Sequence, residues 1–182
     1  MSFNLFGKKE KNLPGCVFID KTYISTSAKM NACMDLAKTA PNAVFIAWFP
    51  DTARKFKEFF HQHGIDESRL LEARFVHTAL LQHKIPVLIE HYPLHTKEME
   101  LVQNWNRQEI LVFSAMDEPL FKHFGSEKMI PFMKLLGMKE AEAIEHSMVS
   151  RSIIKGQEKI ASQVSFEQTA NSQGEWMEKN IK

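Results

Sequence analysis

The seven residues AVFIAWF, at positions 43–49, are apolar at every position rather than at every second one. A strand with this pattern must be covered on both faces, which is typical of a central strand in a parallel sheet. Pro50 and Asp51 follow directly, and both are typical of the first turn of a helix. Gly64 then ends the helical pattern. A buried strand that runs straight into a helix predicts a βαβ arrangement.

Similar patterns lie on both sides of this unit. Short apolar runs predict further strands at residues 16–20, 69–73, 86–90 and 109–113. Apolar residues at helical spacing predict intervening helices at residues 25–40, 50–64, 78–83 and 95–105. This alternation indicates an α/β fold in three layers, with helices flanking a mostly parallel sheet.

The last third of the chain is expected to be helical. Two short helices ending at glycines are predicted at residues 118–125 and 128–137, and one long helix is predicted from about residue 141. Residues 162–174 are rich in Gln, Ser, Asn and Thr, so they are expected to be exposed or frayed.

The composition is that of one folded domain with something appended, since hydrophobic residues make up 44% of 182 residues and charged residues 25%. A formal net charge of +1 argues against extended binding to nucleic acid or to anionic membranes. No apolar run approaches the roughly 20 residues of a membrane span, and no signal peptide is recognisable. Cys16 and Cys33 lack metal-ligand spacing and are expected to be free thiols in a reducing, cytoplasmic setting.

The stretch from Phe113 to Ile160 reads FSAMDEPLFKHFGSEKMIPFMKLLGMKEAEAIEHSMVSRSIIKGQEKI. It closely resembles the end of the second nucleotide-binding domain of SecA, the preprotein translocase ATPase, where that domain runs into its helical scaffold. The matching positions, all in the family's order, are Leu120, Phe121, Phe124, Gly125, Leu136, Gly137, Met138, Ile144, Glu145, His146, Met148, Val149, Ser150, Arg151, Ile153 or Ile154, and Gln157.

A weaker likeness in the same order runs upstream, over residues 20–32 and 43–65, so that it covers roughly residues 16–160. The resemblance implies a sheet like that of RecA and of helicase C-terminal domains, extended by a C-terminal helix. It also implies a division of the chain into a flexible leader over residues 1–15, a motor-domain-like α/β domain over residues 16–140, and a scaffold-like helix with a polar tail over residues 141–182.

The residues that would handle ATP are missing between the matching ends. SecA-like motors keep there a loop rich in glycine and arginine, followed by a loop whose arginines reach the nucleotide. This chain has no glycine between Gly64 and Gly125, and its arginines between Gly64 and Arg151 are Arg69, Arg74 and Arg107. Close approach of backbone to phosphate generally needs glycine, and an arginine finger needs the guanidinium fork. No GxxxxGK[ST] loop occurs either. We therefore expect no ATPase activity and no cofactor.

Polar side chains follow three of the predicted strands, as Asp20, Asp51, Glu90, His91 and Tyr92. The carboxyl ends of parallel strands share one edge, where open α/β sheets bind ligands, so these residues are candidates for a ligand or partner surface. The simpler interpretation is that they cap helices and turns.

Two further residues are candidates for a partner surface. Arg107 is the one arginine in a segment that could face a nucleotide bound to a partner chain. Trp176 lies in a polar tail with no evident core to join. The histidines suggest no metal site, because Pro93 interrupts the spacing of His91 and His95 and no cysteine ligand accompanies them.

Three hypotheses for function follow. The first is a non-catalytic, SecA-like interaction module that serves as an accessory or regulator of protein translocation. The second is a small-molecule-binding protein or enzyme that uses the strand ends near Asp20, Asp51 and Glu90. The third is the partner half of a split motor. A protein partner is expected in the first and third cases, and the apolar stripe of the C-terminal helix also predicts a homodimer.

Overall fold

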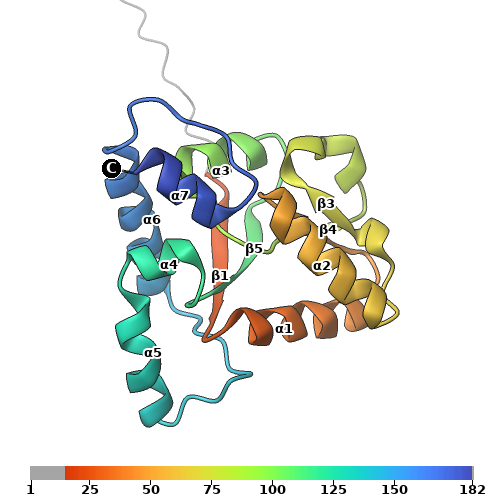
Figure 1. Ribbon diagram of the computed structural model, residues 1–182. Coiled ribbons are helices and arrows are strands. Elements are labelled where there is room, and N and C mark those ends of the chain that lie inside the picture. Colours follow the sequence, from red (N-terminus) through yellow and green to blue (C-terminus); the bar gives the residue numbers. More distant parts are fainter. Residues whose placement is uncertain (1–14, 182) are drawn as a thin grey trace, which may run out of the picture.

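The computed structural model describes residues 15–181, so the expected leader over residues 1–15 lies almost wholly outside the described part. Five strands form one sheet in the order β1-β5-β4-β2-β3, and every pairing is parallel. The strands are β1 (Val17–Tyr23), β2 (Ala43–Ala47), β3 (Leu70–Glu72), β4 (Ile85–Leu88) and β5 (Glu109–Ala115). The α/β fold with a parallel sheet between helices is thereby confirmed (Figure 1).

Seven α-helices are present among the described residues. They are α1 (Thr26–Thr39), α2 (Pro50–Gln62), α3 (His95–Val102), α4 (Pro119–His123), α5 (Ser126–Leu135), α6 (Ser147–Ala161) and α7 (Gln173–Asn180). Three 3₁₀ turns join β2, β3 and β4, namely η1 (Glu67–Arg69), η2 (Ala73–Phe75) and η3 (Thr78–Leu81). Within residues 15–181, no helix is long and apolar enough to cross a membrane.

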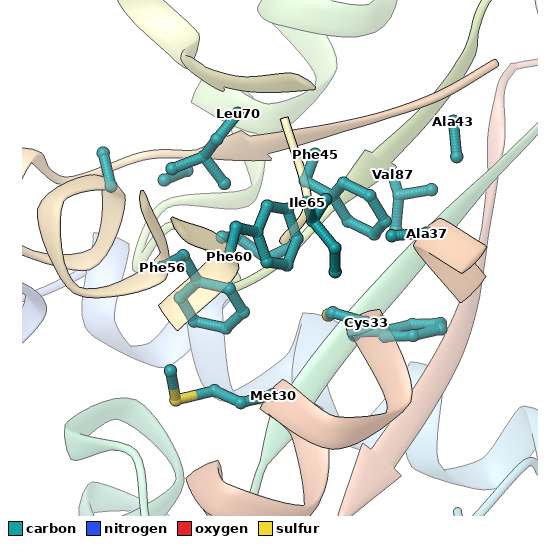
Figure 2. Close-up of a cluster of buried hydrophobic side chains, with 14 of the residues drawn as sticks. Met30, Cys33, Ala37, Ala43, Phe45, Phe56, Phe60, Ile65, Leu70 and Val87 are labelled. Atoms are coloured by element: carbon teal, nitrogen blue, oxygen red, sulfur yellow. The ribbon is translucent and has the colours of Figure 1, made fainter. Parts of the chain in front are cut away.

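One face of the sheet is covered by α1 and α2. Figure 2 shows Met30 and Cys33 of α1 beside Phe56 and Phe60 of α2, with Phe45 of β2 packed against this layer. The rings of Phe45 and Phe60 meet edge to face, with centroids 5.1 Å apart. Strand β2 is buried at all five positions, which is the outcome expected from its uninterrupted apolar sequence.

The opposite face is covered by α3 and the 3₁₀ turns. Val44, Ile46, Leu88 and Val112 point to this side, and they pack against a layer that includes Leu81, Val102 and Trp105. Because side chains alternate along each strand, the same strands supply both cores.

A third apolar cluster joins α4, α6 and α7 to the end of the sheet. It contains Phe49, Leu120, Ile153, Ile160 and Trp176, and the last two are fully buried. The expectation of an exposed or frayed segment before residue 174 is wrong in part, because Val164 and Ala170 pack against this cluster. Burial of an indole and several aliphatic side chains supplies the free energy that holds the tail in place.

The long helix expected from about residue 141 is shorter than the sequence suggested. Helix α6 begins at Ser147, with His146 as its N-cap, and Ile144 instead forms an antiparallel bridge with Thr22 of β1. Pairing of Ile144 with the open edge of β1 is thus favoured over helix formation in residues 141–146.

Candidate functional site at the carboxyl edge of the sheet

The chain changes direction between the neighbouring strands β2 and β4. Strand β2 leads into α2 on one face of the sheet, whereas β4 leads into α3 on the other face. Such a switch point opens a crevice at the carboxyl ends of the strands, and ligands of open α/β sheets generally bind there. This crevice is therefore the first place to look for a functional site.

Glu90, which follows β4, lies at this switch point and bonds to the residues that begin α2. One carboxylate oxygen of Glu90 accepts hydrogen bonds from the backbone N–H groups of Trp48 and Phe49, at 2.9 and 3.0 Å. The other oxygen accepts a bond from the Thr52 hydroxyl at 2.7 Å. Glu90 thus occupies the start of α2, where unpaired N–H groups attract an anion.

Burial raises the pKa of Glu90 to about 7, although Lys29 and the hydrogen bond from Thr52 oppose this rise. The group is fully enclosed, with 3% of its surface exposed. Its titration therefore falls near neutral pH, where the charge at the start of α2 changes.

Asp117 fills the corresponding position at the start of α1. Its carboxylate accepts the backbone N–H of Thr26 at 2.8 and 3.0 Å, and the Thr26 hydroxyl at 2.7 Å. Ser25 caps the same helix through a bond from the Ala28 N–H at 3.1 Å. Sequence reasoning missed Asp117, although an acid two residues after an apolar strand is a recognisable signal.

Lys29 of α1 forms a second buried contact that the sequence did not single out as a site residue. Its ammonium group donates to the Ile89 carbonyl at 2.5 Å and pairs with the Glu118 carboxylate, and 1% of the residue is exposed. Burial alone would lower the pKa of Lys29, but Glu118 and Glu90 raise it. The charged lysine therefore ties α1 to the ends of β4 and β5.

His91 lies between two carboxylates on the other side of the sheet. Its Nε2 is 2.8 Å from Asp20 Oδ1, and its Nδ1 is 2.8 Å from Glu98 Oε1. Burial would lower the pKa of His91, but Glu98 and Asp20 raise it to about 10. Both ring nitrogens therefore act as donors, and the histidine is an imidazolium at neutral pH.

Gln157 brings α6 into this network. Its amide nitrogen donates to the Tyr92 carbonyl at 2.7 Å and to Glu98 Oε2 at 2.9 Å. Tyr92 in turn donates its hydroxyl to Glu167, which also accepts the Trp176 indole N–H at 3.1 Å. The tail is thus fastened to the sheet by polar as well as apolar contacts.

The structure brings only some of the candidate residues together. Asp20 and His91 are paired, and Tyr92 contacts Trp176, with ring centroids 5.8 Å apart. Glu90 is separate from that pair, because it faces the start of α2.

The remaining candidates lie apart from one another. Asp51 is exposed in the first turn of α2, where it pairs with Arg54 at 3.3 Å. Arg107 lies at the amino edge of the sheet, where it donates to the Lys84 carbonyl at 2.8 Å. Trp176 is not at the surface, because it is fully buried against Tyr92 and its neighbours in the third apolar cluster.

Two hollows border this part of the molecule. One, of about 940 Å³, lies over the strand ends and is lined by Trp48, Arg74, Tyr92, Lys97 and Glu167 among others. The other, of about 590 Å³, runs along β1 and reaches Asp20, His91 and Arg151.

Within residues 15–181, no group of three or more His, Cys, Asp or Glu side chains is arranged to hold a metal ion. The carboxylates at the sheet edge are instead engaged with backbone N–H groups, with hydroxyls or with cations. These contacts can hold the neighbouring helices in place, and the buried carboxyl of Glu90 changes its charge near neutral pH.

Comparison with known proteins gives no matching family model, but it gives several related proteins. The chain is 46% identical over 50 residues to the protein translocase subunit SecA of Acidithiobacillus ferrooxidans and, over the same length, to that of Ehrlichia canis. It is 40% identical over 55 residues to the SecA subunit of Chlorobium phaeobacteroides. These matches cover 28–30% of the chain and 5–6% of the relatives.

Proposed function

Because about 50 residues of the chain form a SecA-related region, we propose that the protein is a non-catalytic interaction module in protein translocation. It would act as an accessory or regulator on the cytoplasmic side, with a protein of the translocation machinery as its partner. The matched region is a small part of the relatives, so their whole activity is not transferred.

The observation that carries the non-catalytic part is that the starts of α1 and α2, the two helices on one face of the sheet, already hold a carboxylate. Glu90 occupies the N–H groups before α2, and Asp117 occupies those of α1. A nucleotide phosphate would need these same groups, and it would meet a negative charge in its place. Binding would therefore require both the loss of these bonds and the removal of a carboxylate.

The three arginines between Gly64 and Arg151 support the same proposal. Arg69 donates to the carbonyls of Ala37, Ala40 and Ala43, at 2.7, 2.7 and 3.0 Å. Arg74 pairs with Glu72 at 2.8 Å, and Arg107 is held at the amino edge. Arg69 and Arg107 thus bond to the chain at the amino edge, and Arg74, which lines the hollow over the strand ends, is engaged by Glu72 rather than set aside for a phosphate.

The alternatives receive less support from the geometry. A binding site built from Asp20, Asp51 and Glu90 needs the three side chains to converge, and they lie in three separate contacts. A split motor needs Arg107 near a partner's nucleotide, and the residue lies at the edge opposite the strand ends.

We further propose self-association, through α5 rather than through the C-terminal helix. Helix α6 folds back and buries Ile153 and Ile160 within the chain. Helix α5 buries only Ser126 and leaves its apolar stripe exposed, namely Met129, Phe132, Leu135 and Leu136, each by 55–82%. A second copy presents the same stripe, so each copy would cover the other.

Two measurements test the proposed function. Isothermal titration of the chain with MgATP should give no binding heat at millimolar nucleotide, and saturable heat or phosphate release would contradict the non-catalytic part. Copurification with a tagged chain, under mild crosslinking, should recover the translocase motor or its membrane partner. Failure to recover either would refute the link to translocation.

A further inference from the structure

Among residues 15–181, strand β1 is an edge strand, because β5 is the one strand that pairs with it there. Its odd-numbered residues bond to β5, since the Val17 N–H donates to the Gln108 carbonyl and the Tyr23 carbonyl accepts the Met116 N–H. The even-numbered residues therefore direct their N–H and C=O groups away from the sheet.

The chain itself uses this outer side at one point. Thr22 and Ile144 exchange two backbone hydrogen bonds, at 2.8 and 3.2 Å, in an antiparallel bridge. His146 then begins α6, and the chain leaves the strand. Phe18 and Asp20, the next even-numbered residues, have no backbone partner on this side in the part of the chain that the structure describes.

A groove of about 590 Å³ lies along this open edge. It is lined on one side by the five consecutive residues from Cys16 to Asp20, and on the other by α6, including Ser147, Ser150 and Arg151. The lining also includes His91, His95 and Met99, so the groove follows β1 on the side of the sheet that α3 covers. Its volume falls within the range of ordinary ligand sites, roughly 300–1,000 Å³.

The walls of the groove are mainly apolar. Val17 and Ile19 are exposed by 55% and 37% on one face of the strand, and Phe18, Met99 and Ile153 line the other side. Polar side chains also line the groove, among them Asp20, His91 and Glu145, and two others have bonding capacity left over. The Gln157 side chain is 1% exposed, and its Oε1 accepts no hydrogen bond from the described residues. Arg151 forms no ion pair within residues 15–181.

We propose that this groove binds an extended polypeptide segment, which adds to β1 as an antiparallel strand. The segment would continue the pairing that Ile144 begins, and would bond to the backbone of Phe18 and Asp20. Side chains on one of its faces would pack on Val17 and Ile19, and should be apolar or β-branched. An acidic residue of the segment would pair with Arg151. This binding goes beyond the proposed role in translocation and does not depend on it.

The physical reason for a peptide occupant is the combination of unpaired main-chain groups with a flanking helix. A bare strand edge pairs readily with other strands and favours aggregation. Helix α6 contacts β1 and forms the other wall of the groove, which would limit any pairing, at the usual spacing of about 4.8 Å, to a single strand rather than a whole sheet.

Fluorescence anisotropy of the full chain with labelled nonapeptides tests the proposal. The probe alternates isoleucine and threonine and carries one glutamate. Its matched control has the same side chains with every amide N-methylated, which removes the donors needed for pairing. Saturable binding of the probe, at least tenfold tighter than that of the control, is expected. Equal affinity for the two peptides, or no saturation with either, would overturn the proposal.

Two protein variants locate the site. Ile19→Lys should weaken binding of the probe at least tenfold, whereas Leu80→Lys, at a residue of similar exposure remote from the groove, should leave it unchanged. Val17→Lys serves as a second edge variant if Ile19→Lys lowers the melting temperature. Equal weakening by Leu80→Lys would place the peptide elsewhere.

Hydrogen exchange supplies an independent readout. The amides of Phe18 and Asp20 should exchange rapidly in the free protein and at least tenfold more slowly when the probe is saturating. The amide of Val17, which already donates to Gln108, should change less. Unchanged exchange at Phe18 and Asp20 would overturn the pairing. A negative result here leaves the copurification result untouched, so the two failures are distinguishable.

Discussion

Acidic residues after parallel strands have two possible roles, and Glu90 illustrates how the structure decides between them. The sequence placed Glu90 at the strand ends and left both a ligand site and a helix cap open. The observed bonds from Trp48, Phe49 and Thr52 make it a cap for α2. Neither local pattern nor spacing could have shown this, because the donors lie about 40 positions away in the sequence.

Replacement of Glu90 by glutamine should remove a pH dependence of stability. Burial raises the pKa of Glu90 to about 7 in the folded chain, from 4.5 for a solvated glutamate. The protonated form is thus favoured on folding, and its contribution is complete below pH 4.5 and lost as the pH rises through 7. The loss amounts to about 3 kcal/mol at 1.36 kcal/mol for each unit of pKa. Glu90→Gln should show a correspondingly flatter profile in urea unfolding between pH 5 and pH 8.

His91 also makes stability depend on pH, because its pKa of about 10 lets stability fall as the pH rises above 6.5. The pH profile of the wild type must therefore be compared with that of Glu90→Gln. The difference between the wild type and Glu90→Gln isolates Glu90. Glu100→Gln, at an exposed carboxyl of α3, is the matched control and should run parallel to the wild type. If Glu90→Gln also ran parallel, the carboxyl of Glu90 would titrate normally.

At the scale of elements, the sequence located all five strands, with differences of a few residues at their ends. Apolar runs such as residues 43–49 require burial wherever they lie, so their structure is fixed locally. Helices α6 and α7 were not placed correctly for the opposite reason. The start of α6 depends on the bridge between Ile144 and Thr22, and the position of α7 depends on contacts of Trp176 with Tyr92 and Glu167. Both depend on residues distant in the sequence.

Helices α4 and α6 pack closely at Gly156, which yields a prediction for a single methyl group. A Cβ at Gly156 would lie 2.3 Å from the ring of Phe124, so Gly156→Ala must displace the ring or the helix. Overpacking of this kind costs typically 1–3 kcal/mol, and helix propensity offsets up to about 1 kcal/mol of it, so we expect a net loss of up to about 2 kcal/mol in urea unfolding.

Gly174 of α7 provides the matched control for this substitution. A Cβ there meets no atom closer than 3.6 Å, so Gly174→Ala should be neutral or stabilise the chain by up to about 1 kcal/mol through helix propensity. Equal effects of the two substitutions would show that α4 and α6 are not closely packed in solution.

At the scale of the whole molecule, apolar surface is distributed unevenly. Most large apolar side chains belong to the three clusters, whereas α5 extends from the body at the lower left of Figure 1 with its stripe uncovered. A helix that is apolar over much of its circumference is normally covered. The net charge of +1 presents no electrostatic barrier between copies.

The free energies are of the right order for a reversible dimer. Burial of each exposed side chain of the stripe contributes about 1–2 kcal/mol. Two copies supply eight side chains, hence roughly 10 kcal/mol before the cost of association, which is about 4–15 kcal/mol. At the low end of that cost about 6 kcal/mol remains, which predicts a weak dimer that forms at roughly tens of micromolar or above rather than a permanent one.

Sedimentation velocity over a range of concentrations should therefore show a monomer–dimer equilibrium that Leu135→Glu abolishes. Leu135 is 82% exposed, so the substitution removes apolar surface from the interface and changes the stability of the monomer by no more than about 0.5 kcal/mol. Phe166→Glu is the matched control, because Phe166 is 83% exposed but lies outside α5, and this variant should dimerise like the wild type. A wild type that stays monomeric at every concentration, or a Phe166→Glu variant that loses the dimer as well, would mean that α5 does not form the interface.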